Sequence, residues 1–223
     1  MQATIKSFVL RAGRVSKRQQ YALETWLVDY EMPKSADLWC IDEAFGRKAE
    51  TIVEIGFGMG STLLQMAEQQ PEVNFIGIEV HQAGIGSLVA SLHEHQIKNV
   101  RIAPFDAVEV FGTCIPDNTL KGVQIFFPDP WPKKRHQKRR LINPAFVKKL
   151  VTKLQVGGYL HCATDWKDYA ESMLRVLNSE STLINQQGQG GFVPRPTYRP
   201  LTKFEQRGTR LGHAVWDLIF NRI

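Results

Sequence analysis

Asp129 lies in a segment whose residue types suit contact with a nucleic acid. This carboxylate stands between Pro128 and Pro130, Trp131 follows, and six cations occupy residues 133–140. A carboxylate can accept from the N–H groups of a base, and an aromatic ring can stack on it. A dense run of lysine and arginine suits a phosphate backbone. The segment therefore predicts the place where an enzyme meets a nucleic acid.

A glycine loop forms a second motif. Gly56, Gly58 and Gly60 follow a predicted strand and precede a predicted helix, which lets a ligand approach the backbone at a helix N-terminus. The dinucleotide-binding motif has its last glycine one residue later, where this chain has Ser61. An acid at the loop would also repel the pyrophosphate of a dinucleotide, and Glu54 stands there. These features favour a cationic ligand without phosphate, such as S-adenosylmethionine.

Further acids follow predicted strands, and with Asp129 they should share one edge of the sheet, where open α/β sheets bind ligands. They are Glu54, Glu79, Asp106 and Asp165. Glu79 is placed to take ribose hydroxyls, and Asp106 to bind the adenine amino group. The alternative for each acid is that it only caps the next helix.

The elements that must position these residues alternate between strand and helix from about residue 50. The expected strands are 51–55, 74–78, 100–103, 122–127 and 157–163, with a late antiparallel hairpin near 181–185 and 214–220. The expected helices are 16–28 behind Ser16, 61–69, one ending near 96, one capped by Asn143, and 166–177. This alternation predicts an α/β fold with a mostly parallel seven-stranded sheet, an antiparallel edge and helices on both faces.

Charge gathers in two places on the chain of 223 residues. Residues 1–20 carry five cations and no acid, and residues 126–140 carry six cations and one acid. Because the net charge is +6, the rest of the chain carries −4. Two basic clusters on an acidic body favour a polyanionic partner that binds both clusters. The alternative is that these residues are only solvated surface charges. We expect a flexible basic arm over 1–20 and one domain over 21–223.

Other classes of protein are disfavoured. No apolar run approaches the roughly 18–20 residues that span a bilayer, and the N-terminus lacks signal-peptide features. Cys40, Cys114 and Cys162 are too far apart for a disulfide framework or a zinc spacing. We therefore expect a cytoplasmic protein without a metal or a membrane partner.

Five blocks together resemble the bacterial tRNA (guanine-N7-)-methyltransferases, the TrmB family. The blocks are EIGFGMG at 54–60, GIEV at 77–80, FPDPWPKKRH at 127–136, TDW at 164–166 and TKFE at 202–205. The similarity runs from about residue 8 to the end. It implies a class I (Rossmann-like) fold, S-adenosylmethionine as methyl donor, and methylation of N7 of the guanine at position 46 of the tRNA variable loop. DNA is not an expected partner, and a monomer or a homodimer is possible.

The resemblance also implies residue roles. Asp129 would be the catalytic residue, and it would contact the cofactor together with Glu54, Glu79 and Asp106. The substrate would be held by Lys133, Asp165, Thr202, Lys203, Phe204 and Glu205. RNA would touch Arg135, His136, Gln137, Lys138, Arg139 and Arg140. The sequence departs from the family pattern at Ala83, where we expect proline, and in a thin basic arm at residues 11–14.

Guanine N7 has an in-plane lone pair and no proton, so its methylation needs orientation and charge stabilisation but no general base. Asp129 is the expected group nearest the reacting centre, with Asp165 or Glu205 on the base edge. The alternatives are a helix cap for Asp165 and a solvated loop acid for Glu205. Trp131 and Phe204 are expected to stack on the base, with core packing as the alternative role.

Two segments are expected to move. An α-helix over 133–140 would stack like charges at i,i+4, so we predict a loop that is mobile until RNA orders it. Residues 194–200 are expected to form a second flexible lid. The rival functions are a non-catalytic RNA-binding protein on this fold and an adenine or cytosine amino-methyltransferase. An amino-methyltransferase would have a second proline at the position of Trp131.

Overall fold

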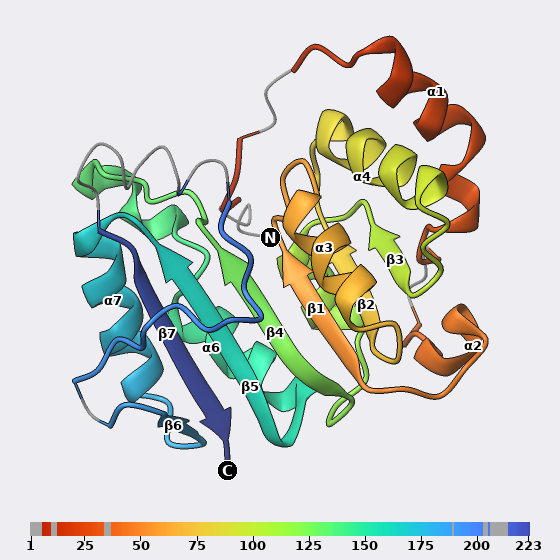
Figure 1. The fold of residues 1–223 in the computed structure, drawn as a ribbon. Coiled ribbons are helices and arrows are strands. Elements are labelled where there is room, and N and C mark those ends of the chain that lie inside the picture. Colours follow the sequence, from red (N-terminus) through yellow and green to blue (C-terminus); the bar gives the residue numbers. More distant parts are fainter. Residues whose placement is uncertain (1–5, 10–12, 34–36, 189, 203–204, 206–213) are drawn as a thin grey trace.

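The computed structural model describes residues 6–9, 13–33, 37–188, 190–202, 205 and 214–223. Seven strands lie side by side in one sheet in the order β3-β2-β1-β4-β5-β7-β6 (Figure 1). The strands are β1 Thr51–Ile55, β2 Asn74–Ile78, β3 Val100–Ala103, β4 Leu120–Phe126, β5 Leu154–Thr164, β6 Leu183–Asn185 and β7 Trp216–Arg222. Strands β1 to β5 pair in parallel, whereas β7 is antiparallel to both β5 and β6. The predicted mixed sheet with an antiparallel edge is confirmed.

The direction of strand addition reverses between β1 and β4. The chain passes from β1 through β2 to β3 in one direction and then returns to β4 and β5 on the other side of β1. Ile55 of β1 pairs with Ile78 of β2 and with Ile125 of β4. The carboxyl ends of these three strands therefore meet at the topological switch point, where an open α/β sheet has its binding crevice.

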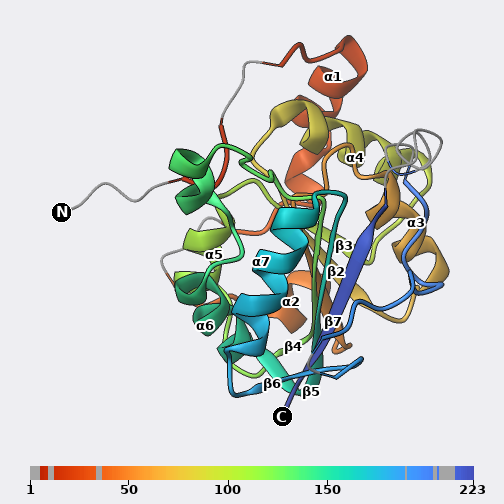
Figure 2. The ribbon, with the colours of Figure 1, turned by 90° about the vertical axis from the view of Figure 1, so that its left-hand side faces the viewer.

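Helices cover both faces of the sheet, as Figure 2 shows edge-on. Helices α5, α6 and α7 lie on one face, and α3 and α4 lie on the other, with α1 packed outside α4. The helices are α1 Lys17–Thr25, α2 Ile41–Phe45, α3 Ser61–Gln69, α4 Gln82–Glu94, α5 Ala107–Thr113, α6 Pro144–Lys153 and α7 Lys167–Asn178, with 3-10 helices η1 Leu27–Asp29 and η2 Lys134–Arg139. One hydrophobic cluster fills each face.

Local sequence signals explain most of these bounds. Strands β1 and β2 are buried along their whole length, as their apolar composition predicts for a sheet covered on both faces. Asn143 caps α6 by accepting from the backbone N–H of Phe146, with Pro144 in the first turn. Strands β4 and β5 begin earlier than predicted, at Leu120 and Leu154, and helices α2 and α5 were not predicted.

The boundary of the N-terminal arm differs from the prediction. Ser16 and Gln19 form a capping box at the start of α1, and Arg18 reaches Glu94 of α4 at 2.6 Å. Residues 16–20 therefore belong to the folded domain. Nearer the terminus, residues 6–9 run along the carboxyl edge of the sheet. Within the described ranges, no helix has the length and apolar character needed to cross a membrane.

Candidate active site

A cavity of about 180 Å³ opens at the switch point, between the carboxyl ends of β1, β2 and β4. Its wall combines residues from the glycine loop, the end of β2, the segment after β4 and the N-terminal segment. They include Ser7, Phe8, Gly56, Glu79, His81, Phe105, Phe127 and Asp129. Predicted cofactor residues thus share one cavity with the predicted catalytic aspartate.

The glycine loop requires glycine for its backbone shape. Gly56, Gly58 and Gly60 have φ angles of +76°, +57° and +81°, in the region that side chains disfavour. A Cβ on Gly60 would also lie 2.7 Å from Cβ of Leu88 on α4. The loop is therefore both left-handed and closely packed, and it delivers the chain to the N-terminus of α3 beside the cavity.

Glu54 is a buried acid with an unused oxygen. Its side chain is 3% exposed, and Oε2 has no hydrogen-bond partner within the described part of the chain. Burial, and secondarily the charge of Glu79, raises the pKa of Glu54 to about 8. A buried polar atom without a partner is costly, so this oxygen favours a donor or cation brought by a ligand.

Glu79 holds the glycine loop and the start of the next segment together. Its Oε2 accepts from Gly58 N at 3.0 Å, and its Oε1 accepts from Val80 N and His81 N. His81 Nδ1 also contacts Oε1 at 2.8 Å, while Nε2 lies 3.2 Å from the carbonyl of Val9. A carboxylate and a carbonyl both accept, so this arrangement favours an imidazole that donates from both ring nitrogens.

The pKa of His81 agrees with that assignment. Burial alone lowers it, but the hydrogen bonds to Glu79 and Val9 outweigh burial, and the nearby charge of Asp129 adds to them, so the net shift is upward. His81 therefore binds a proton more readily than a free imidazole, beside two acids of the cavity. We missed this residue in the sequence, although a histidine two positions after a strand-terminal Glu is a signal that could have been used.

Asp106 caps helix α5. Its Oδ1 accepts from Val108 N at 2.9 Å, and its Oδ2 lies 3.7 Å from Nζ of Lys6. The capping alternative is thus present in the structure, and the second oxygen faces the N-terminal segment. Neither Asp106 nor Glu54 lines the cavity, in contrast to Glu79 and Asp129.

The segment after β4 carries backbone strain next to Asp129. Phe127 has φ +52° and Trp131 has φ +44°, which are uncommon values for bulky residues. Phe127 N donates to the carbonyl of Ala163 at 2.8 Å, which ties the turn to β5. Strained positions of this kind cluster at functional sites. They lie on both sides of Asp129, which is exposed at the cavity wall.

Trp131 connects three parts of the site. Its Nε1 donates to the carbonyl of Ser7 at 3.0 Å, which holds the N-terminal segment across the cavity. Arg139 lies over its ring with the guanidinium carbon 4.8 Å from the centroid, and His136 meets it edge-on. The ring is therefore covered by protein groups and would stack on a base only after these contacts rearrange.

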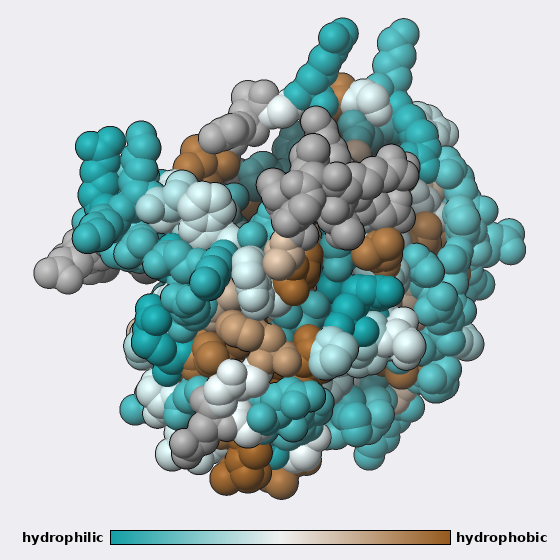
Figure 3. Space-filling model, turned by 60° about the vertical axis from the view of Figure 1, so that its left-hand side comes forward, coloured by the Kyte–Doolittle hydropathy of each residue, from teal (hydrophilic) through white to brown (hydrophobic). Residues whose placement is uncertain are grey.

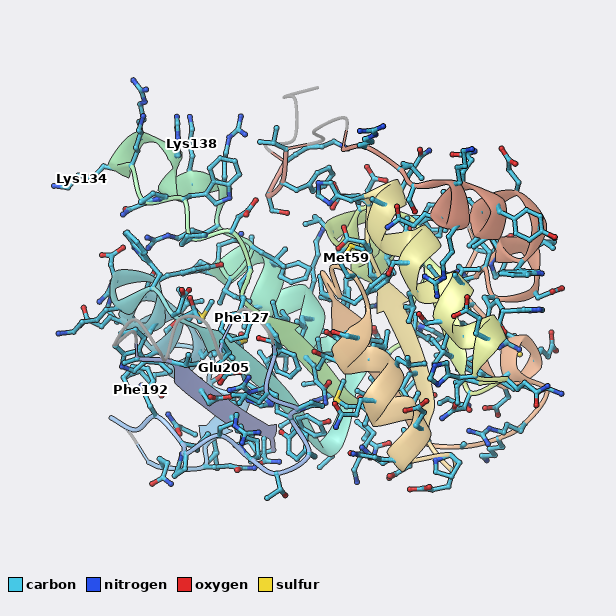
Figure 4. All side chains as sticks on the ribbon, turned by 45° about the horizontal axis from the view of Figure 1, so that its top comes forward. Met59, Phe127, Lys134, Lys138, Phe192 and Glu205 are labelled. Atoms are coloured by element: carbon cyan, nitrogen blue, oxygen red, sulfur yellow. The ribbon has the colours of Figure 1, made fainter. Side chains whose placement is uncertain are left out.

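The basic segment forms the short helix η2 rather than the predicted loop. A 3-10 helix eclipses residues at i and i+3, so it replaces the i,i+4 contacts of an α-helix with i,i+3 contacts such as that of Arg135 with Lys138. Figure 4 shows Lys134 and Lys138 extending from η2 away from the sheet. Lys133 and Arg135 are also exposed, and His136, Gln137 and Arg139 are half-buried. Mobility without RNA remains a prediction.

Arg140 does not belong to the RNA surface, which corrects our prediction. It is 5% exposed, and its guanidinium bonds Asp168 at 2.5 Å and the carbonyl of Pro130 at 2.9 Å. The same group lies over the ring of Tyr169 at 4.7 Å. Arg140 therefore anchors the segment to α7 instead of facing solvent.

The remaining substrate candidates divide into three cases. Asp165 makes no hydrogen bond or ion pair within the described ranges and does not cap α7, whose N-cap is Trp166. Glu205 is 4% exposed with both oxygens bonded to Arg199 at 2.7 and 2.8 Å, so it is not a solvated loop acid, and its role on the base edge stays a prediction. Thr202 Oγ1 accepts from Glu205 N at 3.0 Å. Lys203 and Phe204 lie outside the described residues.

On the face in Figure 3, hydrophilic side chains predominate and hydrophobic ones form small separate areas.

Comparison with known proteins agrees with this geometry. A family model described as "Putative methyltransferase" matches residues 48–218. A tRNA (guanine-N(7)-)-methyltransferase of Legionella pneumophila (strain Paris) is 64% identical over 99% of this chain and 94% of its own length. The protein of that name from Ralstonia pickettii (strain 12J) is 52% identical over 98% of this chain and 84% of its own.

Solved structures support the fold. The 16S rRNA methyltransferase KamB has a TM-score of 0.61 at 12% identity, covering 83% of this chain and 94% of that one. The aminoglycoside resistance methyltransferase NpmB1 has a TM-score of 0.55 at 13% identity, covering 82% and 92%. These likenesses identify the class I methyltransferase fold. The near full-length similarity at 64% identity shows that the chain belongs to the tRNA (guanine-N(7)-)-methyltransferase family.

Proposed function

We propose that this protein transfers a methyl group from S-adenosylmethionine to N7 of a guanine in the variable loop of tRNA. The observation that carries the proposal is the cavity at the switch point, which joins Gly56, Glu79 and Asp129, with the basic helix η2 following Asp129 closely along the chain. The names and the near full-length similarity of the relatives support the same reaction. A cytoplasmic location follows from tRNA as the substrate.

The donor set fits S-adenosylmethionine. The unpaired, buried Oε2 of Glu54 offers an acceptor to a cationic group, and Glu79 reaches the cavity wall beside the glycine loop. Asp106 would stand at the next strand end, with one oxygen engaged by α5. When bound, S-adenosylmethionine supplies a methyl group on a positively charged sulfur.

Asp129 would orient the guanine and stabilise the charge that develops on it. N7 carries a free lone pair, so no side chain has to remove a proton to create the nucleophile. A carboxylate can accept from the base edge, and its negative charge opposes the positive charge that appears on the purine during transfer. Asp165, unpaired within the described ranges, is the better second acceptor because Glu205 is bound by Arg199.

The RNA would lie across η2. Lys134, Arg135 and Lys138 are exposed and free to meet phosphates, and Lys133 stands at the start of the helix. His136 has a pKa lowered by partial burial and then by the cations Arg135, Arg139, Lys133 and Lys138. A phosphate would relieve that repulsion, so we expect His136 to gain a proton when RNA binds.

The test is methyl transfer from labelled S-adenosylmethionine to a tRNA transcript, followed by chemical cleavage at N7-methylguanine. We expect one cleavage product in the variable loop, and none with Asp129→Ala. Label without cleavage would place the methyl group on another atom, as an amino-methyltransferase would. Absence of S-adenosylmethionine binding in calorimetry would favour a non-catalytic RNA-binding protein.

A further inference from the structure

Arg199 is a fully buried cation that the proposed reaction does not use. Its side chain is 0% exposed, and it bonds two acids. Nε and Nη2 donate to Asp217 at 2.7 and 2.9 Å, and Nη1 and Nη2 donate to Glu205 at 2.7 and 2.8 Å. Two bidentate carboxylates fix the guanidinium plane in one orientation.

Asp217 extends this cluster into the sheet. It lies on β7, opposite Ala163 of β5, and also accepts from His161 Nε2 at 2.8 Å. Burial lowers the pKa of His161, which favours the neutral ring, so Nε2 carries the proton and Nδ1 accepts from the Tyr198 hydroxyl at 2.9 Å. The pKa of Asp217 is also lowered, because the bonds from His161 and Arg199 outweigh the effect of its burial.

Arg199 also lies against the turn that carries Asp129. Its guanidinium carbon is 5.7 Å from the ring centroids of both Phe126 and Phe127. Phe127 is one of the strained residues, and it precedes Asp129 by only two positions. Figure 4 shows Phe127 and Glu205 at the same end of the sheet. The Arg199 side chain therefore touches the turn before Asp129 and binds Glu205.

Stability alone does not explain this arrangement. Buried ion pairs lose so much solvation that apolar packing of the same volume is often as stable. What an ionic cluster adds is geometry, because each hydrogen bond has a preferred length and direction. Here hydrogen bonds tie Asp217 of β7 to Glu205 through Arg199, and the ring contacts add Phe126 at the end of β4 and Phe127 after it. The predicted flexible lid at 194–200 thus contains a residue, Arg199, that is fixed in the core.

We propose that Arg199 is a positioning residue for methyl transfer, which holds Glu205 and the Phe127–Asp129 turn in a fixed relation. This inference rests on the proposed function. Glu205 then acts through Arg199 and through its backbone N–H to Thr202, and its carboxylate does not contact the base. Loss of this relation would misplace the guanine relative to Asp129 while leaving the glycine loop and Glu54 unchanged.

The test uses two variants. Arg199→Lys keeps the positive charge but loses the paired N–H donors of the guanidinium, and Glu205→Gln keeps the side-chain size and leaves Arg199 bonded to Asp217. Arg175→Lys, an exposed change of the same chemistry on α7, is the control. Single-turnover methyl transfer at saturating tRNA is measured well below the Tm of each variant, with S-adenosylmethionine affinity measured by calorimetry. Misplacement by about 1 Å can cost about 100-fold in rate, so we expect a loss of that order in Arg199→Lys with cofactor affinity unchanged.

The double variant tests the shared pathway. If Glu205 acts only through Arg199, the double variant should be no slower than the slower single variant. Multiplied losses would mean that Glu205 acts on the substrate by itself, which would overturn the inference. A wild-type rate in Arg199→Lys would also overturn the inference. If Arg199→Lys fails to fold, a wild-type rate in Glu205→Gln would overturn it instead. If the wild-type protein itself gives no N7-methylguanine, the proposed function fails instead.

Discussion

Binding of S-adenosylmethionine should release a proton from Glu54. In the free protein, burial and the neighbouring Glu79 raise the pKa of Glu54 to about 8, so the side chain is mostly protonated at neutral pH. A bound cation favours the carboxylate. At pH 7, ionising a group of pKa about 8 costs about 1.4 kcal/mol, which is a factor of about ten in affinity.

The perturbation is Glu54→Gln, and the quantity measured is the ratio of wild-type to variant affinity between pH 6 and 9. Taking this ratio cancels the ligand's own titration, because both proteins bind the same ligand. We expect the ratio to rise about tenfold from pH 6 to pH 7 and to level off above about pH 8. Calorimetry at pH 7 in two buffers of different ionisation enthalpy should detect release of nearly one proton by the wild type.

Glu50→Gln is the matched control. Glu50 is an exposed acid just before β1 that pairs with Lys121 at 3.0 Å, far less buried than Glu54. This variant should keep the wild-type pH dependence. An affinity ratio for Glu54→Gln that stays flat from pH 6 to 8 would refute the reasoning, since it would show that Glu54 does not change its protonation when the cofactor binds.

Four further outcomes are expected. In the absence of cofactor, Glu54→Gln should raise the free energy of unfolding more at pH 8 than at pH 5, and the difference should be up to about 4 kcal/mol. The reason is that an acid with a raised pKa in the folded state destabilises the protein as pH rises above the ordinary pKa of that acid. Asp129→Ala should lower the single-turnover rate by about 100- to 1,000-fold with tRNA affinity nearly intact, and an equal loss in binding would contradict its assigned role. Neutralising Arg135 and Lys138 should reduce the slope of log affinity for tRNA against log salt concentration by roughly 0.7–0.9 per lost phosphate contact. Arg140→Gln should leave that slope unchanged and should lower the free energy of unfolding, measured in denaturant, by about 1–3 kcal/mol. Amide exchange across 133–140 should be fast in the free protein and slow with tRNA, and protection without tRNA would show that η2 is already stable.

Much of the fold could be predicted because its signals are local. Strands β1, β2 and β3 have the predicted bounds, since short apolar runs between turn residues are typical of strands in a sheet covered on both faces. The start of α6 followed from Asn143 and Pro144. Helix η2 was missed, because the choice between an α-helix, a 3-10 helix and a loop depends on neighbours distant in sequence.

The acids at the strand ends were a topological prediction, and the structure decided how each is used. Parallel strands bring their carboxyl ends to one edge, so Glu54, Glu79 and Asp129 had to lie near one another. Their environments are set by packing. Glu54 became a buried acid with an unpaired oxygen, whereas Glu79 became the acceptor for loop amides.

By itself, the sequence determined the strands, the cofactor edge and the basic segment beside Asp129, because apolar runs, turn residues and charge runs are properties of short stretches of chain. Only the tertiary structure distinguished Arg139 from Arg140, two identical neighbours. The first lies over Trp131 at the surface, and the second is buried against Asp168 and Tyr169. The tertiary structure also paired Arg199 with both Glu205 and Asp217. Burial decides whether a charge meets solvent and RNA or a buried partner, and burial is a property of the packed chain rather than of the residue.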